Sequence, residues 1–363
     1  YRMIGDAFDY SEKYKTPVLF RTTTRVCHGC VSLAPELPRK KIVPGGFKRD
    51  PKWVIFPKLS YARHVEIEKI QREMANDLSS YPRNAMDGNG KLGIVASGVS
   101  YTYVKEALEL LDVSPKLLRI ATANPFPDAL ALSFLHGLER VLVLEELDPV
   151  VEEALLQLCG AYHLPVEICG KHSGHLPYAG EYSTEIARGA IADFYHITLE
   201  DTKAEELPPL PIRPPVLCAG CPHRASFYAV KCAMHGQRAV FTGDIGCYTL
   251  GNAKPLDMVD TCLCMGAGVT IAQGLARTNP GTHAFAFIGD STFFHTGIPG
   301  VINAVYNQTD MTLVVLDNST TAMTGHQPHP GTGKTMMGAV SDKIDKKRSL
   351  VVNAVAFIFI FFS

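Results

Sequence analysis

The sequence has no excess of charge of either sign, since 35 Lys and Arg residues stand against 36 Asp and Glu residues in a chain of 363. Proteins that bind phosphate backbones or anionic lipid through charge are basic, so nucleic acid is not an expected partner. Ten cysteines are too few for a disulfide scaffold in so long a chain. The first residues also lack the pattern of a secretory leader, so we expect a cytoplasmic protein.

Long apolar runs are scarce as well. Residues 351–362 are apolar apart from Asn353, but a helix needs about 20 apolar residues to span a bilayer, so no membrane association is expected. We interpret this run as an atypical tail. Apolar residues make up 46% of the chain, which is enough for two or three domain cores.

Hydrophobic patterns predict two α/β regions. In the first, β-type segments alternate with helical patterns, which predicts a parallel sheet with helices on both faces. The β-type segments are residues 92–98, 117–122 and 140–146, and the helical patterns are residues 101–111, 128–138 and 149–159. The second region begins at residue 216, with strands expected at 239–243, 284–290 and 311–318 and helices at 225–234 and 298–308.

The remaining segments have weaker patterns. Residues 1–14 are compatible with a helix, residues 16–26 are β-rich, and residues 61–78 have the charge density of an exposed helix. Proline in residues 205–215 disfavours helix and strand, which predicts a stiff linker, with a P-x-x-P docking site as the alternative.

Polar residues follow two strands of the second region. Gly289 allows a sharp turn after its strand, and Asp290 offers a hard carboxylate oxygen. Because a right-handed βαβ unit brings both strand ends to one edge, Asp290 and Asn318 should converge there. This pairing predicts a magnesium site that serves a diphosphate, with residues 265–276 as a glycine-rich approach to the phosphates. The alternative is an ordinary βαβ unit with a polar strand end.

Several longer motifs occur in order: residues 217–231 (LCAGCPHRASFYAVK), 241–251 (FTGDIGCYTLG), 261–268 (TCLCMGAG), 287–300 (FIGDSTFFHTGIPG) and 317–333 (DNSTTAMTGHQPHPGTG). Together with Gly289, Asp290 and Asn318, they resemble the thiamine-diphosphate domain of the alpha subunits of indolepyruvate ferredoxin oxidoreductases. Ser291 stands where the usual motif has a third Gly. The resemblance extends over nearly the whole chain up to about residue 346.

The resemblance implies an α/β fold of parallel-sheet domains of the thiamine-diphosphate-binding type. Residues 1–37 would be the C-terminal remnant of a pyrimidine-binding domain, followed by a linker and helix at 38–90. A transketolase-C-terminal-like α/β domain would cover 91–201, a Pro-rich linker 202–215, the diphosphate-binding domain 216–346 and the atypical apolar tail 347–363. On this interpretation the chain is a fragment truncated at both ends, and the catalytic Glu that activates the cofactor lies outside it.

The resemblance also implies site residues. Magnesium would be held by Asp290, the Asn318 side chain and the Thr320 carbonyl. Cofactor-binding residues would be Gly243, Asp244, Gly246, Cys247, Met265, Gly266, Gly268, Gly289, Asp290, Ser291, Thr292, Asn318, Thr320, Met323 and Thr324.

Cys218 and Cys221 form a C-x₂-C pair, and Cys247 follows the next predicted strand. Such thiolates can ligate zinc or an iron–sulfur cluster, or they can have a structural role without a ligand. The resemblance points to a four-iron cluster (4Fe-4S), although a fourth cysteine ligand is not evident. Cys27 and Cys30 form another pair that lacks the companions of a zinc, haem or redox motif.

Four histidines lie in the motif loops: His223, His295, His326 and His329. An imidazole there could move a proton or contact a carboxylate of the substrate, and a structural role is the alternative for each. Residues 328–335 end like a nucleotide-binding P-loop, but Pro328 stands where the first Gly belongs, so we reject that function.

The activity implied by the resemblance is oxidative decarboxylation of arylpyruvates to aryl-acetyl-CoA, with ferredoxin as electron acceptor. Its cofactors would be thiamine diphosphate, Mg²⁺ and the 4Fe-4S cluster, and its partners would be a beta subunit, ferredoxin, coenzyme A and the arylpyruvate substrate. Two alternatives stay open, namely a non-redox thiamine-diphosphate decarboxylase and a cofactor-binding subunit that is inactive without a partner.

Overall fold

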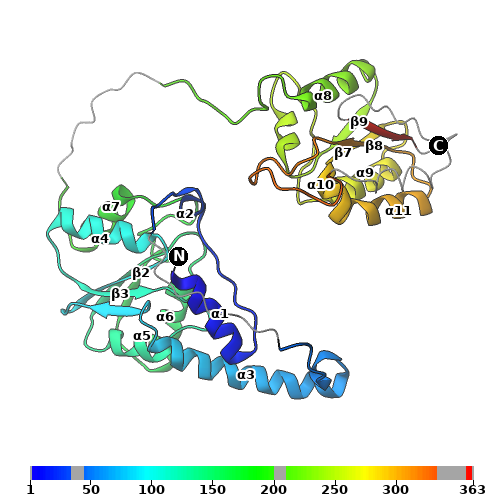
Figure 1. The fold of residues 1–363 in the computed structure, drawn as a ribbon. Helices are drawn as coiled ribbons and strands as arrows, with labels where there is room; N and C mark the ends of the chain where they lie inside the picture. The colour runs from blue at the N-terminus through cyan, green and yellow to red at the C-terminus, as the bar shows by residue number, and fades with distance from the viewer. Residues whose placement is uncertain (1, 34–44, 200–209, 333–356, 362–363) are drawn as a thin grey trace. The chain divides into compact units, whose positions relative to one another are not determined.

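The computed structural model describes residues 2–33, 45–199, 210–332 and 357–361 of the chain (Figure 1). The chain divides into two compact units, residues 1–205 and 206–363. Each unit has its own sheet and its own buried core, so each is α/β, as expected. Residues 38–44 and 202–209 of the expected linkers and most of the expected tail at 347–363 lie outside the described residues.

Unit 1 is built on a five-stranded sheet with strand order β1-β3-β2-β4-β5. The strands are β1 (Ala85–Asp87), β2 (Leu92–Ser97), β3 (Lys116–Ile120), β4 (Arg140–Leu144) and β5 (Glu167–Cys169). The four strands from β2 to β5 are parallel, and β1 is an antiparallel edge strand. The sequence patterns correctly predicted β2, β3 and β4, whereas the short β1 and β5 had no clear pattern.

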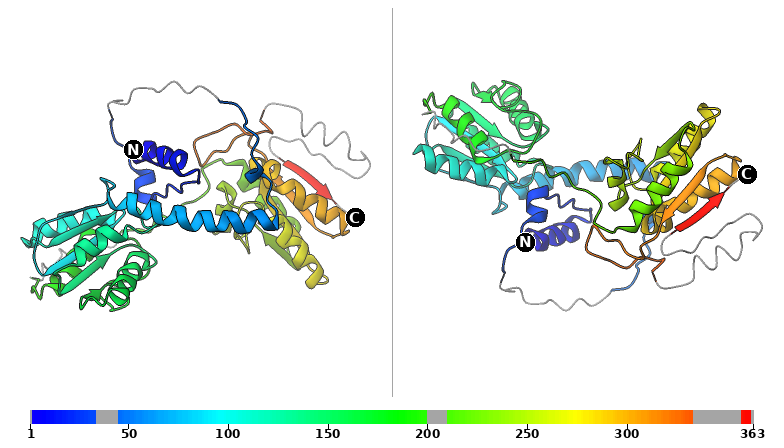
Figure 2. Two further views of the ribbon diagram at one scale, coloured as in Figure 1. Left: turned by 90° about the horizontal axis from the view of Figure 1, so that it is seen from below. Right: turned by 90° about the horizontal axis from the view of Figure 1, so that it is seen from above.

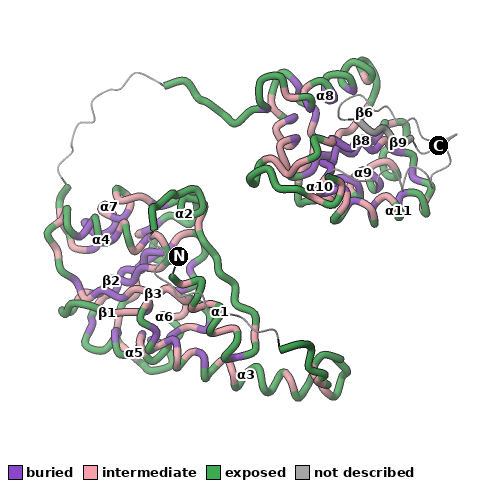
Figure 3. The backbone as a smooth tube through the Cα atoms, viewed as in Figure 1, coloured by how far each residue is buried: buried purple, intermediate pink, exposed green. Residues whose placement is uncertain are grey.

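Helices cover both faces of this sheet, because side chains alternate along each strand. Ile94 and Ala96 pack with α4 (Ser100–Leu111) and α7 (Thr184–Phe194). Val95 on the opposite face packs with α5 (Asp128–Leu135) and α6 (Val150–Ala161). Figure 3 shows the resulting buried centre of the unit.

The N-terminal segment differs from the expectation in one respect. Residues 16–26 were expected to form a strand, but residues 16–23 have no regular structure and are followed by the short helix α2 (Thr24–His28). A strand is stable only when a neighbour pairs with it, and none of the described strands pairs with this segment. The expected helices are present as α1 (Arg2–Tyr14) and α3 (Pro57–Ser79), and a 3₁₀ turn, η1 (Pro51–Trp53), precedes α3.

The helix α3 is long and mostly exposed, as Figure 2 and Figure 3 show. Its buried residues, Met74 and Leu78, both lie near its C-terminal end. There α1 packs beside it, because Tyr10 meets Tyr81 edge to face and Asp6 accepts a 2.6 Å hydrogen bond from the Tyr81 hydroxyl. Among the described residues, no helix is both long and apolar enough to cross a membrane.

Unit 2 has a four-stranded sheet in the order β6-β7-β8-β9. The strands are β6 (Ala239–Thr242), β7 (His283–Gly289), β8 (Thr312–Leu316) and β9 (Phe357–Phe361). The first three are parallel, and β9 pairs antiparallel with β8. The last part of the apolar tail is therefore an edge strand of the sheet.

The two faces of this sheet again carry different helices. Phe285 and Phe287 pack with α8 (Pro222–Ala233) and the 3₁₀ helix η2 (Cys247–Asn252). Ala286 and Ile288 on the other face pack with α9 (Ala267–Thr278) and α11 (Ile298–Tyr306). Between β7 and α11 lie one helical turn, α10 (Asp290–Thr292), and the π-helical segment η3 (Phe293–Gly297).

Candidate functional site

The candidate site lies where the parallel strands of unit 2 end. Because β6, β7 and β8 run in the same direction, their carboxyl ends meet at one edge of the sheet. Gly243 and Asp244 follow β6, Asp290 follows β7, and Asn318 follows β8. The starts of α8 and α9 reach the same edge, because His223 in the first turn of α8 contacts the Tyr248 ring and the Gly266 N–H before α9 donates to Asp244.

Asp290 and Asn318 are in direct contact. The Oδ2 atom of Asp290 accepts a hydrogen bond of 3.2 Å from the backbone N–H of Asn318, and Oδ1 accepts one of 2.8 Å from Ser291. The side-chain oxygen of Asn318 accepts a 3.3 Å hydrogen bond from the backbone N–H of Thr320. The carboxylate, the amide oxygen and the Thr320 backbone are thus connected in one local network.

Asp290 also has a histidine neighbour. His329 Nε2 lies 3.0 Å from Asp290 Oδ2, and both side chains are almost fully buried, at 3% and 6% exposure. The contact lacks hydrogen-bond geometry, because Nε2 of His329 has no hydrogen-bond partner among the described residues. The loop holds His329 in place through a 3.1 Å hydrogen bond from the Gly331 N–H to Nδ1 and through a ring contact with Phe294.

The electrostatics of Asp290 suit a cation. Burial raises the pKa of the Asp290 carboxyl, and the neighbouring Asp317 adds to this rise, while the Ser291 N–H and His329 oppose it. A buried carboxylate of this kind is stabilised by a positive charge. The oxygen donors of Asp290, Asn318 and Thr320 are the hard ligands that magnesium prefers, so these residues fit that ion.

A second buried carboxylate organises the start of α9. Asp244 is fully buried, and its Oδ1 accepts a 2.6 Å hydrogen bond from the N–H of Gly266. Gly266 precedes α9 with φ of 86°, a left-handed conformation that favours glycine. Burial raises the pKa of Asp244, and hydrogen bonds from Gly266 and the Tyr248 hydroxyl oppose the rise. The free N–H groups of the first turn of α9 suit a diphosphate.

Close backbone contacts also require glycine in this region. A side chain at Gly268 would collide with the carbonyl of Gly243, and one at Gly289 would collide with the ring of Tyr248. The glycine pattern in the sequence indicated these turns, but the role of Tyr248 was missed. Tyr248 lies in the motif at residues 241–251, but the motif does not indicate what its ring and hydroxyl contact, so only the tertiary structure reveals its role.

The three cysteines of the expected cluster lie near one another. Burial raises the pKa of the Cys247 thiol, and the charges of Cys221 and Cys218 raise it further, while the Met323 backbone N–H lowers it. Cys218 is exposed and the other two are half-buried. Within residues 2–33, 45–199 and 210–332, however, no group of three or more His, Cys, Asp or Glu side chains is arranged to hold a metal ion.

The remaining predicted residues differ in their positions. Gly246, Met265, Ser291 and Thr292 belong to the turns at the same edge of the sheet, and Thr292 is buried. Met323 and Thr324 are exposed in the loop after β8.

The four histidines also differ. His295 and His326 are exposed, whereas His223 is buried in the first turn of α8, and within the described part of the chain its Nδ1 has no hydrogen-bond partner. Burial lowers the pKa of His223, which favours the neutral ring. The structure therefore brings His329, of the four, into contact with Asp290.

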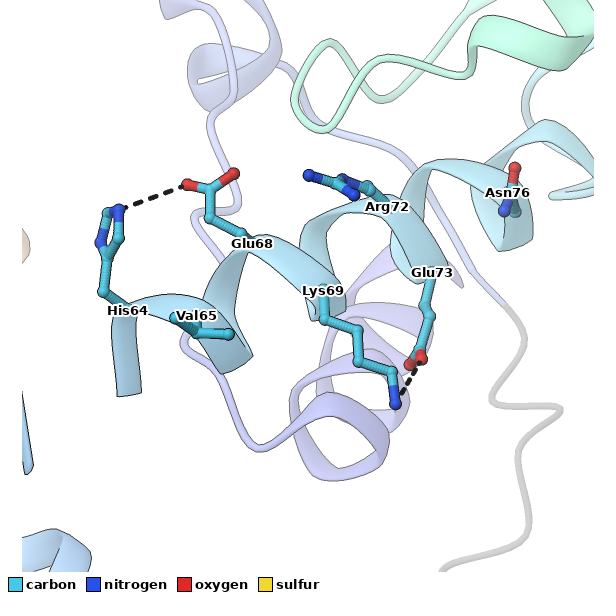
Figure 4. A pocket seen from close by; sticks show the side chains of 7 residues that line it. All are labelled: His64, Val65, Glu68, Lys69, Arg72, Glu73 and Asn76. Carbon is cyan, nitrogen blue, oxygen red and sulfur yellow. Dashed lines mark ion pairs between the residues drawn. The ribbon is translucent and has the colours of Figure 1, made fainter. Parts of the chain in front are cut away.

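A shallow surface pocket in unit 1 lies away from these residues, along the side of α3 (Figure 4). The helix presents two exposed ion pairs there, with His64 Nε2 3.8 Å from Glu68 and Lys69 Nζ 3.7 Å from Glu73. Pairs of this spacing are common on exposed helices and are weak. We therefore place no catalytic function at this surface.

Comparisons with known proteins find similarity over the segment that contains Asp290 and Asn318. Residues 244–357 match the family model of the thiamine pyrophosphate enzyme C-terminal TPP binding domain. Indolepyruvate oxidoreductase subunit IorA of Methanothermobacter thermautotrophicus is 39% identical, over 98% of this chain and 59% of that protein. IorA of Thermococcus kodakarensis is 43% identical, over 92% of this chain and 55% of that protein.

A solved 2-oxoglutarate:ferredoxin oxidoreductase from Magnetococcus marinus is more distant. It is 17% identical over 44% of this chain and 28% of that chain, with a TM-score of 0.29, which is too low for a geometric comparison. The chain spans between 53% and 59% of the length of the first three curated relatives. Over most of its length the chain is similar to indolepyruvate oxidoreductase IorA subunits, and its residues 244–357 match the thiamine pyrophosphate-binding domain model.

Proposed function

We propose that the chain holds thiamine diphosphate and Mg²⁺ in an enzyme that oxidatively decarboxylates arylpyruvates. The observation that carries the proposal is the contact between Asp290 and Asn318 at the sheet edge, inside the segment that matches a thiamine pyrophosphate-binding domain. The names of the relatives support the substrate class, since they are indolepyruvate oxidoreductase subunits.

The residues of the site have distinct tasks in this proposal. Asp290, the Asn318 side chain and the Thr320 carbonyl hold magnesium, and His329 moves away from Asp290 when the ion binds. The N-terminus of α9, oriented by Asp244 through Gly266, binds the diphosphate. Gly243, Gly246 and Gly289 keep the backbone free of side chains at the turns that approach it.

Thiamine diphosphate, when bound, supplies the nucleophilic carbon and the electron sink that a 2-oxoacid needs in order to lose carbon dioxide. The chain binds and orients the cofactor and excludes water around the diphosphate. In the complete enzyme we propose that the acyl group passes to coenzyme A and that single electrons pass to ferredoxin. Another subunit, as the relatives' names indicate, would take part in the reaction.

Binding of the cofactor is tested by calorimetric titration of the full chain with thiamine diphosphate, with and without magnesium. We expect magnesium-dependent binding that Asp290→Ala weakens by about 100-fold or more, because the carboxylate supplies the charge of the ion site. Asp310→Ala changes an exposed aspartate of the same unit and is the matched control. Equal binding by wild type and Asp290→Ala would contradict the assignment.

We also propose that Cys218, Cys221 and Cys247 hold a 4Fe-4S cluster together with a ligand from outside this set. The proposal is supported by the C-x₂-C spacing of Cys218 and Cys221 and by their proximity to Cys247, whose thiol pKa their charges raise. Anaerobic reconstitution with iron and sulfide should give a brown protein, and Cys221→Ser should lose the colour, whereas Cys232→Ser, in an exposed position on α8, should keep it. A colourless wild type that still binds the cofactor would favour a non-redox decarboxylase or a cofactor-binding subunit.

A further inference from the structure

We propose that Tyr248 is a positioning residue for the diphosphate site, because it ties together the turns that follow β6 and β7. The inference rests on the proposed function and concerns a residue that need not touch the cofactor. Tyr248 belongs to η2, and 8% of its surface is exposed. Its ring and its hydroxyl make separate contributions.

The ring of Tyr248 packs against the backbone of two turns that contain glycine. A Cβ atom at Gly246 or at Gly289 would collide with ring atoms of Tyr248, so the backbone of both turns lies directly on this ring. Gly246 follows β6 and Gly289 ends β7, and these strands are neighbours in the sheet. A side chain of another shape at position 248 would therefore shift the backbone of both turns.

The hydroxyl of Tyr248 contacts polar groups in the same two turns. It lies 3.1 Å from Asp244 Oδ2 and 3.0 Å from the carbonyl of Ile245, both in the turn after β6. It also lies 3.2 Å from the hydroxyl of Thr292, two residues beyond Asp290. Thr292 and Asp244 are both buried, so water cannot replace these contacts without entering the core.

The network continues to the third element of the site. Asp244 uses its other carboxylate oxygen, Oδ1, to accept the hydrogen bond from Gly266 at the start of α9. Tyr248 therefore fixes the orientation of Asp244, and Asp244 fixes the first N–H groups of the helix. Through two side chains, the turns after β6 and β7 and the start of α9 keep one mutual geometry.

The packing around Tyr248 explains why its ring holds one position. Its ring meets the buried His223 edge to face, with ring centroids 6.1 Å apart, and belongs to the same core cluster as Phe227 and Phe287. A rigid ring with a fixed hydroxyl preorganises the backbone donors around it, which lowers the entropy cost of binding.

The test uses the full chain and two probes, thiamine diphosphate with magnesium and inorganic pyrophosphate with magnesium. Tyr248→Phe keeps the ring and removes the hydroxyl, so we expect about tenfold weaker binding of both probes, measured by calorimetry. Tyr248→Leu also loses the ring and should bind more weakly than Tyr248→Phe. Tyr306→Phe alters an exposed tyrosine of α11 and is the matched control, with binding like wild type.

A second pair of variants changes Thr292, the residue whose hydroxyl contacts the Tyr248 hydroxyl. Thr292→Val removes the hydroxyl that meets Tyr248, and Thr292→Ser keeps it, so serine should restore the affinity that valine loses. Near-ultraviolet circular dichroism checks that each variant is folded at the temperature of titration, because a purely structural role would change unfolding without changing the affinity of the folded chain.

The outcomes separate the two claims. If wild type binds thiamine diphosphate and Tyr248→Phe binds it within about twofold of wild type, the positioning role is wrong. If Tyr248→Phe does not fold, equal affinities of Thr292→Val and Thr292→Ser would reject the role, and a loss confined to valine would support it. If wild type binds neither probe, the proposed function itself fails, and this inference fails with it.

Discussion

Both units bury carboxylates at the carboxyl edge of a parallel sheet, but they stabilise them differently. In unit 1, Glu145 follows β4 and Glu152 lies in the first turn of α6, and both are at most 4% exposed. In unit 2, Asp244 follows β6 and Asp290 follows β7, with similar burial. The edge of the sheet is the same place in both units, so the difference lies in the neighbours.

Unit 1 supplies its own cation. The oxygens of Glu145 accept hydrogen bonds from Val151 and Glu152, and the oxygens of Glu152 accept hydrogen bonds from Lys171 and His172. Lys171 is 2% exposed, and its ammonium donates to the carbonyl of Glu145. Burial lowers the pKa of Lys171, and the charges of Glu145 and Glu152 oppose this.

Unit 2 has a histidine where unit 1 has a lysine. Within 4.0 Å of the Asp290 carboxylate, the described residues provide His329 as the basic neighbour, and a histidine is charged only when protonated. The comparison shows that a buried acid at a sheet edge is not by itself a functional site. In unit 1, the charge of Lys171 compensates the buried carboxylates at the sheet edge. In unit 2, no lysine does this at the described sheet edge, so Asp290 can accept a metal ion.

Of the substitutions that test this difference between the units, Lys171→Met should have the largest effect on the free energy of unfolding. The substitution removes the buried ammonium whose charge interacts with Glu145 and Glu152, and leaving buried carboxylates without a compensating charge costs about 3 kcal/mol or more. Urea unfolding of the full chain should therefore show a less stable unit 1, while the affinity for thiamine diphosphate, which unit 2 binds, stays the same.

The control for this experiment is Lys105→Met, at an exposed position of α4, which should change the free energy of unfolding by less than about 0.5 kcal/mol. If Lys171→Met is as stable as the control, the lysine does not neutralise the edge, and the contrast between the two units disappears.

A smaller effect is expected from His223, the buried base of unit 2. Burial lowers its pKa in the folded chain below the ordinary value of 6.5, so between these two pKa values the unfolded chain binds more protons. Stability is therefore complete above about pH 6.5 and decreases as the pH falls through this window, by about 1 kcal/mol per pH unit.

His223→Phe removes this titration, so its stability should fall less than that of wild type between about pH 7 and about pH 5. Thermal unfolding of unit 2 at several pH values measures the difference. His235→Phe, at an exposed position beyond α8, should keep the wild-type dependence. Parallel curves for wild type and His223→Phe would mean that His223 is protonated as easily in the folded chain as in the unfolded chain.

Local patterns predicted much of the fold. The apolar runs at β2, β4, β7 and β8 are long enough to show strands buried on both faces, and the helical patterns after them correspond to α4, α6 and α11. The failure at residues 16–26 has a clear cause, because β-rich composition indicates only that a strand is possible. Whether a strand forms depends on a neighbour that provides hydrogen bonds, and composition does not contain that information.

The sequence by itself determined that Asp290 and Asn318 follow successive parallel strands, and that alone places both at one edge of the sheet. The tertiary structure decided which side chains surround them. Tyr248 lies 44 residues from Thr292, and His329 approaches Asp290 from a loop beyond β8. The positions of the strands along the chain follow from short-range periodicity, whereas contacts such as these depend on how loops pack, and no local pattern specifies that packing.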